Sequence, residues 1–331
     1  MKIGSLDLGE RPLLLAPMED VTDVSFRVLC REQGADMVYT EFVNSDGLIR
    51  DVPRTIAKMH TLEEEAPVGV QIYGQFPDAM VEAARMAEKA AELAGGHGAD
   101  LIDINFGCPV SKIAGRGAGS GMMREPDKMV AITKAVVEAV NKPVTVKTRL
   151  GWDDNSKIIV ELAERLQDAG IAALTIHGRT RCQLYKGAAD WTLIGAVKAN
   201  PRMHIPIIGN GDITDGPSAR DAFERYGVDG IMIGRATFGH PWIFREIKYF
   251  LEHGEPMPPL SVAEKVALAR RHLALSLQYK GEPRGIYEMR RHLSCYFKGL
   301  PDFKPIRMRM VTTLDVAELH DIFDLIETQY A

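Results

Sequence analysis

The sequence of 331 residues contains only four cysteines, at positions 30, 108, 182 and 295, and no two of them have CxxC spacing. This argues against a zinc ribbon and against an iron–sulfur cluster held by cysteine, and few scattered thiols are typical of a reducing compartment. No apolar run is long enough to span a bilayer, and the first residues, MKIGSLDLGERP, lack the apolar segment of a signal peptide. We therefore expect a cytoplasmic protein without a metal site or a membrane segment.

The sequence also lacks low-complexity tracts, and its net charge of −5 gives no general affinity for nucleic acid. The charge is unevenly distributed, however, because residues 265–309 contain eleven Lys or Arg and three acidic residues, a net charge of +8. Residues 310–331 contain five acidic residues and no Lys or Arg. The basic block favours a polyanionic partner, although a solvated helix face paired with neighbouring charges would explain it equally well.

Eight short apolar runs recur in the first 235 residues, with helical patterns between several of them at 77–94, 126–141, 156–169 and 215–226. Their near-continuous apolarity is typical of strands buried on both faces of a parallel sheet. Eight strand–helix units of this length predict a (β/α)₈ TIM barrel. The rival, a doubly wound sheet, would place a glycine-rich dinucleotide motif after an early strand, and none follows PLLLAPM. The runs are PLLLAPM (12–18), MVYTEFV (37–43), PVGVQIYG (67–74), LIDINFG (101–107), VTVKTRL (144–150), ALTIHGR (173–179), IPIIGNG (205–211) and GIMIGR (230–235).

The pattern changes after residue 254, where GEPMPP indicates a linker and only helical patterns follow. We therefore divide the chain into a catalytic barrel at 1–254 and a small helical bundle at 255–331, which contains the basic block. Within RGIYEMRRH, Tyr287, Arg290 and Arg291 recur at helical spacing, so that base stacking and phosphate contact are possible on one face.

A glycine cluster, GRGAGSG at 115–121, follows the fourth predicted strand. It lacks both the GxGxxG order of a dinucleotide motif and the Lys-Ser/Thr ending of a P-loop. We interpret it as a mobile surface loop, in which Lys112 and Arg116 could contact phosphates.

The C-terminal ends of barrel strands carry the chemistry in this architecture. The glycines after the seventh and eighth strands, together with Arg235, favour a phosphate site, although a turn that needs glycine for its backbone is the alternative. Lys147 lies on a buried strand and predicts a charge beside an anionic cofactor, or else a salt bridge to Asp103 on the neighbouring strand. The strand ends deliver Ala16, Pro17, Met18, Gln71, Asn105, Cys108, Lys147, Arg149, His177, Arg179, Asn210, Gly211, Asp212, Gly234 and Arg235.

Seven segments of the sequence, in chain order, resemble those of the tRNA-dihydrouridine synthases, and the pattern is closest to the bacterial B-type subfamily. The resemblance implies reduction of the C5–C6 double bond of particular uridines in tRNA, with bound FMN and with NADPH as reductant. The segments are APMEDVTD, QIYG, DINFGCP, VKTRLGW, IHGRTR, IGNGDI and MIGRA.

The resemblance also implies individual roles. Cys108 becomes the catalytic acid, and an ordinary thiol, with a pKa of about 8.5, is protonated at neutral pH. Asn105 contacts the uracil, while Gln71 and Lys147 lie at the isoalloxazine edge. The other implied flavin contacts are Pro17, Met18, Glu19, His177, Asn210, Gly211, Asp212, Gly234 and Arg235. We expect the RNA to be held by Arg179, Arg181, Arg290 and Arg291, after the target uridine leaves its stack.

Two other functions use the same sequence features. A flavin barrel could reduce a free pyrimidine, as dihydroorotate and dihydropyrimidine dehydrogenases do, although such a substrate needs no basic helical bundle. The chain could also be an RNA-binding protein without catalysis, which the intact Cys108 and Lys147 disfavour. We expect a monomer, and we assign no role to Cys30, Cys182 or Cys295.

Overall fold

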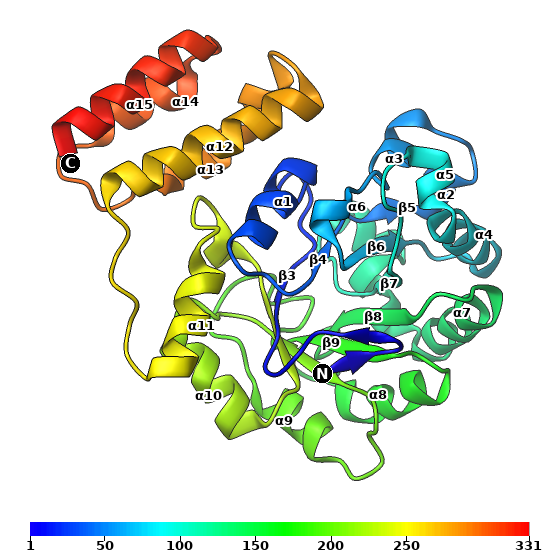
Figure 1. Cartoon of the computed structure of the whole chain (residues 1–331). Helices are drawn as coiled ribbons and strands as arrows, with labels where there is room; N and C mark the ends of the chain where they lie inside the picture. Colours follow the sequence, from blue (N-terminus) through cyan, green and yellow to red (C-terminus); the bar gives the residue numbers. More distant parts are fainter. Residues whose placement is uncertain (331) are drawn as a thin grey trace.

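Parallel strands form a barrel at the centre of the molecule, as the computed structural model, which describes residues 1–330, shows (Figure 1). The sheet has the order β3-β11-β10-β9-β8-β7-β6-β4, and β5 also pairs with β6. The second predicted run forms two short strands, β4 and β5. The strands are β3 (Leu13–Leu15), β4 (Val38–Tyr39), β5 (Val43–Asn44), β6 (Val68–Tyr73), β7 (Leu101–Asn105), β8 (Val144–Arg149), β9 (Ala173–His177), β10 (Ile207–Asn210) and β11 (Gly230–Ile233).

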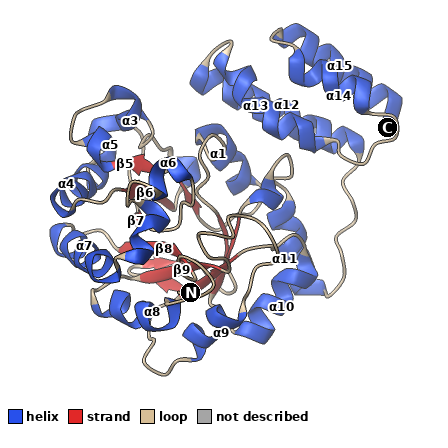
Figure 2. Cartoon of the chain, turned by 180° about the vertical axis from the view of Figure 1, so that it is seen from behind, coloured by secondary structure: helices blue, strands red, loops and turns tan. Residues whose placement is uncertain are grey.

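The two ends of this sheet meet. β3 pairs in parallel with β11 on one side, and on the other a parallel bridge joins Leu14 to Met37, just before β4. The N–H of Leu15 donates to the carbonyl of Met37 at 2.9 Å. Seen from behind, the strands form a central ring surrounded by helices (Figure 2). The predicted TIM barrel is therefore confirmed.

The interior of the barrel is a packed apolar core. Leu14, Met37, Tyr39, Leu101 and other inward side chains form one buried cluster. A hairpin of β1 (Lys2–Ile3) and β2 (Leu6–Asp7) adds Ile3 and Leu8 to it. Met1, just before the hairpin, contacts Gly230 at the first residue of β11, so the hairpin covers the N-terminal end of the barrel and leaves the C-terminal strand ends for a site.

The outer ring contains one long helix, or a pair of helices, after most strands. The helix predicted over 77–94 is two helices, because the chain leaves helical geometry at Lys89 (φ −96°, ψ 21°). Among residues 1–330, no helix combines the length and the apolarity that a membrane crossing needs. The helices are α1 (Val24–Glu32), α2 (Ser45–Leu48), α3 (Pro53–Ala57), α4 (Pro77–Glu88), α5 (Ala90–Ala94), α6 (Ser111–Ala114), α7 (Pro126–Ala139), α8 (Ile159–Asp168), α9 (Thr192–Ala199), α10 (Gly216–Tyr226) and α11 (Ile243–His253), with 3₁₀ turns η1 (Glu63–Glu65), η2 (Gly119–Arg124) and η3 (Arg235–Thr237).

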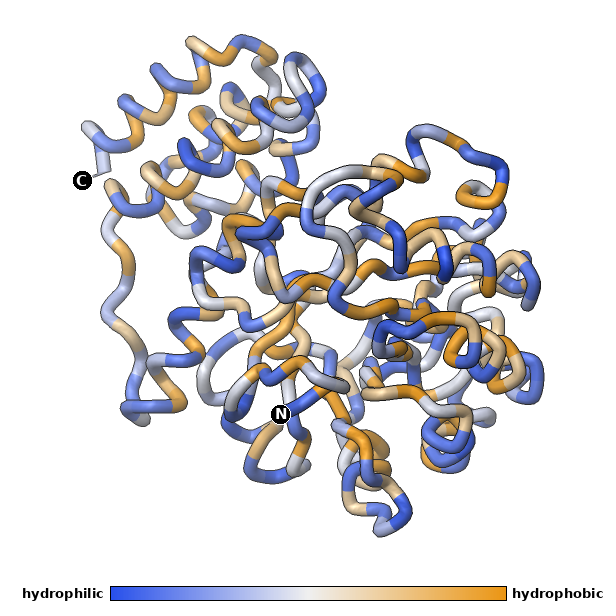
Figure 3. Tube along the Cα trace, turned by 45° about the vertical axis from the view of Figure 1, so that its right-hand side comes forward, coloured by the Kyte–Doolittle hydropathy of each residue, from blue (hydrophilic) through white to orange (hydrophobic). Residues whose placement is uncertain are grey.

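The C-terminal region is a bundle of four helices with its own core, so the predicted bundle is confirmed as an architecture. An extended segment leads into it from the end of α11, and hydrophobic positions recur along its helices (Figure 3). Its core contains Leu273, Leu293, Phe297 and Phe323. The helices are α12 (Val262–Lys280), α13 (Arg284–Tyr296), α14 (Lys304–Thr312) and α15 (Val316–Tyr330).

The bundle docks on α1 of the barrel. Phe26 on α1 lies 5.3 Å from the ring of His272 and 4.2 Å from the ring of His292. Lys280, at the end of α12, is only 9% exposed and forms ion pairs with Asp23 and with Glu288. Asp23 also caps α1 by accepting the N–H of Phe26. The ion pair therefore joins the bundle to the loop that connects β3 with α1.

We expect the Lys280→Met variant to be less stable than the parent by about 2 kcal/mol, because it leaves a largely buried carboxylate without its cation. Burial raises the pKa of Asp23, but Lys280 outweighs this and holds the pKa well below its ordinary value. A carboxyl group with a lowered pKa stabilises the fold above a pH of about 4, and this contribution is lost as the pH falls further.

Urea unfolding followed by circular dichroism at pH 7 and at pH 3.5 measures the effect. The difference between variant and parent should shrink at the lower pH. Lys304→Met is the matched control, since Lys304 is exposed and forms no ion pair within residues 1–330. Equal stability of Lys280→Met and parent at pH 7 would contradict the assignment.

Candidate active site

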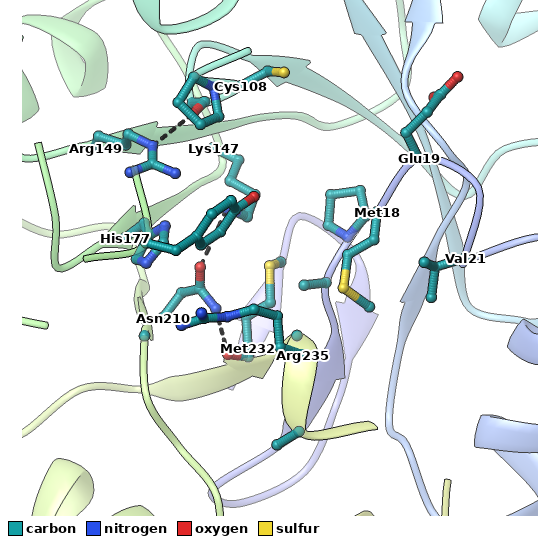
Figure 4. Close-up of a pocket in the computed structure, with 18 of the residues that line it drawn as sticks. Met18, Glu19, Val21, Cys108, Lys147, Arg149, His177, Asn210, Met232 and Arg235 are labelled. Atoms are coloured by element: carbon teal, nitrogen blue, oxygen red, sulfur yellow. Dashed lines mark hydrogen bonds between the residues drawn. The ribbon is translucent and has the colours of Figure 1, made fainter. Parts of the chain in front are cut away.

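A cavity of about 580 Å³ opens at the C-terminal ends of the strands, which is a typical size for a ligand or cofactor site (Figure 4). Loops after β3, β4, β7, β9, β10 and β11 contribute to its wall, β8 contributes Lys147 and Arg149 from the strand itself, and the helical bundle contributes Arg291. Thirteen of the predicted site residues line it. They are Pro17, Met18, Glu19, Asn105, Cys108, Lys147, His177, Asn210, Gly211, Asp212, Gly234, Arg235 and Arg291.

The turn that carries Cys108 is held by Asn105, the last residue of β7. The Asn105 Oδ1 accepts the N–H groups of Gly107 and Cys108, both at 2.9 Å. Its Nδ2 donates to the Oε1 of Gln71 at 2.8 Å, and Gln71 donates to Asp103 at 2.5 Å. Gln71, which was predicted to contact the flavin edge, is fully buried and is not among the residues that line the cavity. Its observed contacts orient the side chain of Asn105.

Cys108 is 9% exposed and lines the cavity. Burial raises its pKa above the ordinary value of a thiol, and the N–H of Val110 and the charge of Arg149 oppose this only in part. A raised pKa keeps the proton on sulfur at neutral pH. The group is therefore suited to donate a proton and poorly suited to act as a thiolate nucleophile.

Lys147 reaches the same cavity from β8. Its Nζ lies 3.3 Å from the Oδ1 of Asn210, and in residues 1–330 no carboxylate lies within 4.0 Å of it. Asp103 instead accepts hydrogen bonds from Gln71 and Thr145, so the predicted alternative of a Lys147–Asp103 salt bridge is wrong. Burial, assisted by the charge of Arg149, lowers the pKa of Lys147 to about 8.

Arg149 and His177 lie beside Lys147 in this wall, and of these two only Arg149 adds a positive charge. Arg149 is buried and donates to the carbonyls of Gly107, Thr180 and Leu184 at 2.7–2.9 Å, without a carboxylate partner in the described chain. Burial lowers the pKa of His177 well below its ordinary value, and Arg149 and Lys147 lower it further, so His177 is neutral. The strand-end pattern named Arg149 but gave it no role.

One carboxylate, that of Asp212, arranges two arginines at the far side of the cavity. It accepts from Arg179 at 2.6 Å, from Arg235 at 3.1 Å and from the N–H of Ala189 at 2.8 Å. Arg179 is only 2% exposed and also donates to the carbonyls of Lys186 and Gly187. The structure therefore does not favour the predicted contact of Arg179 with RNA.

Cations outnumber acidic residues in the wall of the cavity, which contains Lys147, Arg149, Arg235 and Arg291 but only Glu19 and Asp212 as acids. Buried cations are normally paired, yet within residues 1–330 neither Lys147 nor the buried Arg149 has a carboxylate partner. The exposed Arg235 shares Asp212 with Arg179. Gly234 adds no side chain to this part of the wall, where a Cβ would meet the sulfur of Met18 at 3.6 Å, an ordinary contact distance. Both observations fit an anionic ligand such as a phosphate ester.

The predicted RNA-binding arginines separate into different positions. Arg291 on α13 lines the cavity, with its guanidinium 5.7 Å from the ring centroid of Phe238. Arg290 does not line the cavity; it stacks 4.3 Å from the centroid of Tyr287 and donates to the carbonyl of Thr312. Arg181 does not line the cavity but stacks on Trp152, 4.7 Å from its centroid. Of the four arginines predicted to bind RNA, only Arg291 therefore lines the cavity.

No motif in the sequence pointed to Tyr185, which is half-exposed in the loop after β9. Its ring lies 4.7 Å from the guanidinium of Arg235 and 5.6 Å from that of Arg149. The only available signal was the length of the loop, residues 178–191, after a strand end that carries chemistry. The prediction that the glycine cluster 115–121 is a mobile surface loop is wrong, because its second half belongs to the buried 3₁₀ turn η2.

Comparison with known proteins agrees with this geometry. The family described as "Dihydrouridine synthase (Dus)" matches residues 14–327. The chain belongs to the dihydrouridine synthase family. A probable tRNA-dihydrouridine synthase of Rickettsia conorii is 40% identical over 308 residues, which cover 93% of this chain and 90% of that protein. The tRNA-dihydrouridine synthase B of Vibrio cholerae is 42% identical over 298 residues, 90% of this chain and 89% of that protein. The family recognised from the motifs, with its B-type likeness, is confirmed.

Solved structures resemble this dihydrouridine synthase in fold alone. Morphinone reductase aligns with a TM-score of 0.51 at 13% identity, covering 78% of this chain and 90% of that chain. A 2-naphthoyl-CoA reductase aligns with a TM-score of 0.55 at 12% identity, covering 75% of this chain and 51% of that chain.

We expect the alkylation of Cys108 by iodoacetamide to keep accelerating with pH beyond pH 9, because only the thiolate reacts and burial raises the pKa of this thiol. Mass spectrometry of the peptide that contains Cys108 measures the rate separately from that of the exposed Cys182. A rate for Cys108 that levels off at or below pH 8 would show an activated thiolate and would contradict the acid role.

Proposed function

We propose that this dihydrouridine synthase binds FMN in the strand-end cavity and reduces the C5–C6 double bond of particular uridines in tRNA to 5,6-dihydrouridine, with NADPH as reductant. The observation that carries the proposal is the cavity itself. It combines a protonated thiol, an uncompensated group of cations and an arginine of the basic bundle within one space of ligand size.

FMN fits the residues present, since its phosphate ester supplies the anion that the positive wall lacks. We assign the phosphate to Arg235 and to the Asn210–Gly211 and Gly234 backbone, with Asp212 holding Arg235 in place. His177, neutral in the protein alone, keeps a ring nitrogen for a hydrogen bond. Lys147 would lie beside the ring system, where a developing negative charge favours its protonated form. The loop with Pro17, Met18 and Glu19 forms the facing wall.

Bound FMN would supply the hydride to one carbon of the uracil double bond. Cys108 then gives its proton to the other carbon: the S–H bond breaks, a C–H bond forms, and the thiolate recovers a proton from solvent. Asn105 fixes the turn beneath this thiol, and its Nδ2 keeps a second hydrogen for a carbonyl of the base. Lys147 and Arg149 lie close enough to affect the charge left on sulfur.

In this proposal the barrel, residues 1–254, catalyses the reduction. The bundle, residues 255–331, binds the RNA. The position of Arg291 supports it, since a helix of the basic region forms part of the cavity wall. The same position disfavours a free pyrimidine as substrate. We place Arg181 and Arg290 outside the cavity, toward more distant nucleotides. The cytoplasmic location, the monomeric state and the absence of a metal stay predictions.

We expect Cys108→Ala to lower turnover at least 100-fold, because general acid catalysis contributes roughly 10²–10⁴-fold. The variant should retain its flavin absorption and its affinity for tRNA, since the thiol contributes to neither. Nucleoside mass spectrometry of an unmodified tRNA transcript, incubated with enzyme and NADPH, measures dihydrouridine. Cys182→Ala is the matched control and should turn over normally. Unchanged turnover in Cys108→Ala would refute the acid assignment.

We expect Arg291→Ala to raise the KM for tRNA and to reduce the salt dependence of binding by about one unit of slope, as the loss of one phosphate contact does. Flavin content should stay unchanged. Arg220→Ala, an exposed arginine on α10, serves as control. If both variants bind tRNA with the same affinity and salt slope as the parent, the bundle does not hold the RNA through Arg291.

A further inference from the structure

The peptide groups on both sides of Cys108 are fixed by different segments. On the N-terminal side, its N–H donates to Asn105. On the C-terminal side, its carbonyl accepts two hydrogen bonds from Ser120, one from the hydroxyl at 2.8 Å and one from the backbone N–H at 3.1 Å. Because each peptide group is planar, holding both of them fixes φ and ψ of Cys108. The thiol then keeps only its side-chain rotation, with three staggered positions.

The segment around Ser120 is packed too closely to be a mobile loop. Ser120 is fully buried. A Cβ added at Gly119 would lie 2.9 Å from the Cys108 carbonyl oxygen and 3.2 Å from the Cys108 Cβ. Gly119 also has φ +54°, a conformation that favours glycine. A Cβ at Gly121 would meet the carbonyl of Ala114 on α6 at 2.4 Å. Gly119 therefore allows η2 to approach the cysteine turn directly, and Gly121 allows η2 to pack against α6.

We propose that Ser120, held against the turn by Gly119 and Gly121, is a positioning residue that fixes the Cys108 thiol at the wall of the cavity. The GRGAGSG segment thus serves the reaction through the cysteine and not through a phosphate. Ser120 does not line the cavity, so it acts without touching substrate or cofactor. The inference rests on the proposed role of Cys108 as the acid.

The position of the segment around Ser120 should affect the rate of proton transfer, because this segment holds the turn that carries the sulfur. Proton donation requires the sulfur to stay at one place relative to the base, and a displacement of about 1 Å can cost on the order of 100-fold in rate. Loss of the Ser120 hydroxyl removes one of the two bonds to the Cys108 carbonyl and leaves the other. The loss of the Ser120 hydroxyl should therefore lower kcat less than the loss of the Cys108 thiol does.

The first test is Ser120→Ala. We expect kcat to fall about three- to tenfold, the range that one lost hydrogen bond produces. The KM for tRNA and the flavin content should not change. In a Cys108→Ala background the same substitution should cause no further loss, because Ser120 acts only through the thiol. An unchanged kcat, or an equal loss in both backgrounds, would overturn the proposal.

A second readout does not depend on turnover. In the protein prepared without flavin, iodoacetamide should modify Cys108 of Ser120→Ala faster than Cys108 of the parent at pH 8, because a looser turn exposes the sulfur. Peptide mass spectrometry follows this rate beside that of Cys182. Equal rates for Cys108 in variant and parent would also count against the proposal.

Gly119→Ala disturbs the cysteine turn more strongly than Ser120→Ala, and it removes no hydrogen-bonding group. The added methyl group must displace the Cys108 carbonyl, so we expect a kcat at least tenfold lower than that of Ser120→Ala. Gly254→Ala is the matched control, because Gly254 has φ +77° and no heavy atom within 4 Å of the added Cβ. It carries similar backbone strain and should turn over normally. Equal kcat values for the two glycine variants would overturn the proposal.

The outcomes separate this inference from the function on which it rests. If Cys108→Ala loses turnover while Ser120→Ala and Gly119→Ala do not, the acid role stands and the positioning role fails. If Cys108→Ala itself keeps full turnover, the acid role fails and the effect of Ser120 has no basis.

Discussion

The register between β7 and β8 is the constraint on which the site depends. Asn105 lies opposite Lys147 in this parallel pair, and the N–H of Phe106 donates to the carbonyl of Lys147 at 2.8 Å. This places the turn with the thiol and the strand with the ammonium group at the same height in the barrel. A shift of one residue would reverse the faces of every side chain on the strand and would remove one of these groups from the cavity. The proton donor and the cation are therefore fixed relative to each other by backbone pairing.

The cavity wall has more cations than acidic residues, so a bound anion would lower the free energy of the folded protein. Burying Lys147 and Arg149 without carboxylates costs free energy, and the lowered pKa of Lys147, about 8, expresses part of that cost. A bound anion would remove the cost and raise this pKa again. Ligand binding and stability should therefore be coupled, since a ligand that binds only the folded state stabilises it. The same charges keep His177 neutral and able to accept or donate a hydrogen bond.

The sequence was sufficient for the barrel and for most of the cavity wall, because chemistry-bearing residues at strand ends converge at one end of a barrel whatever the details of packing. The sequence was not sufficient to predict how deep in the barrel each of these side chains lies. Gln71 lies opposite Asp103, one layer below the pair of Asn105 and Lys147, so it supports the turn from beneath. The strand pattern shows that Gln71 is in a strand but not its layer, which depends on the stagger between strands.

The sequence also did not show which residues far apart in the chain contact each other. The charge of Arg179 is satisfied by Asp212, 33 residues away. The four glycines of GRGAGSG suggest mobility until the close approach of Gly119 to Cys108 and of Gly121 to α6 is known.

The bundle is connected to the site at two points, and this favours a substrate that spans both parts of the chain. Lys280 binds Asp23 at the end of the loop that carries Pro17, Met18 and Glu19, while Arg291, eleven residues further along, forms part of the cavity wall. The docking of α12 and α13 thus sets both the loop on one side of the cavity and a cation at its edge. A small substrate would gain little from such an arrangement. For an extended polyanion, contacts with the bundle would orient the molecule before one base enters the cavity, so that selection among uridines depends on the whole RNA and not on the base alone.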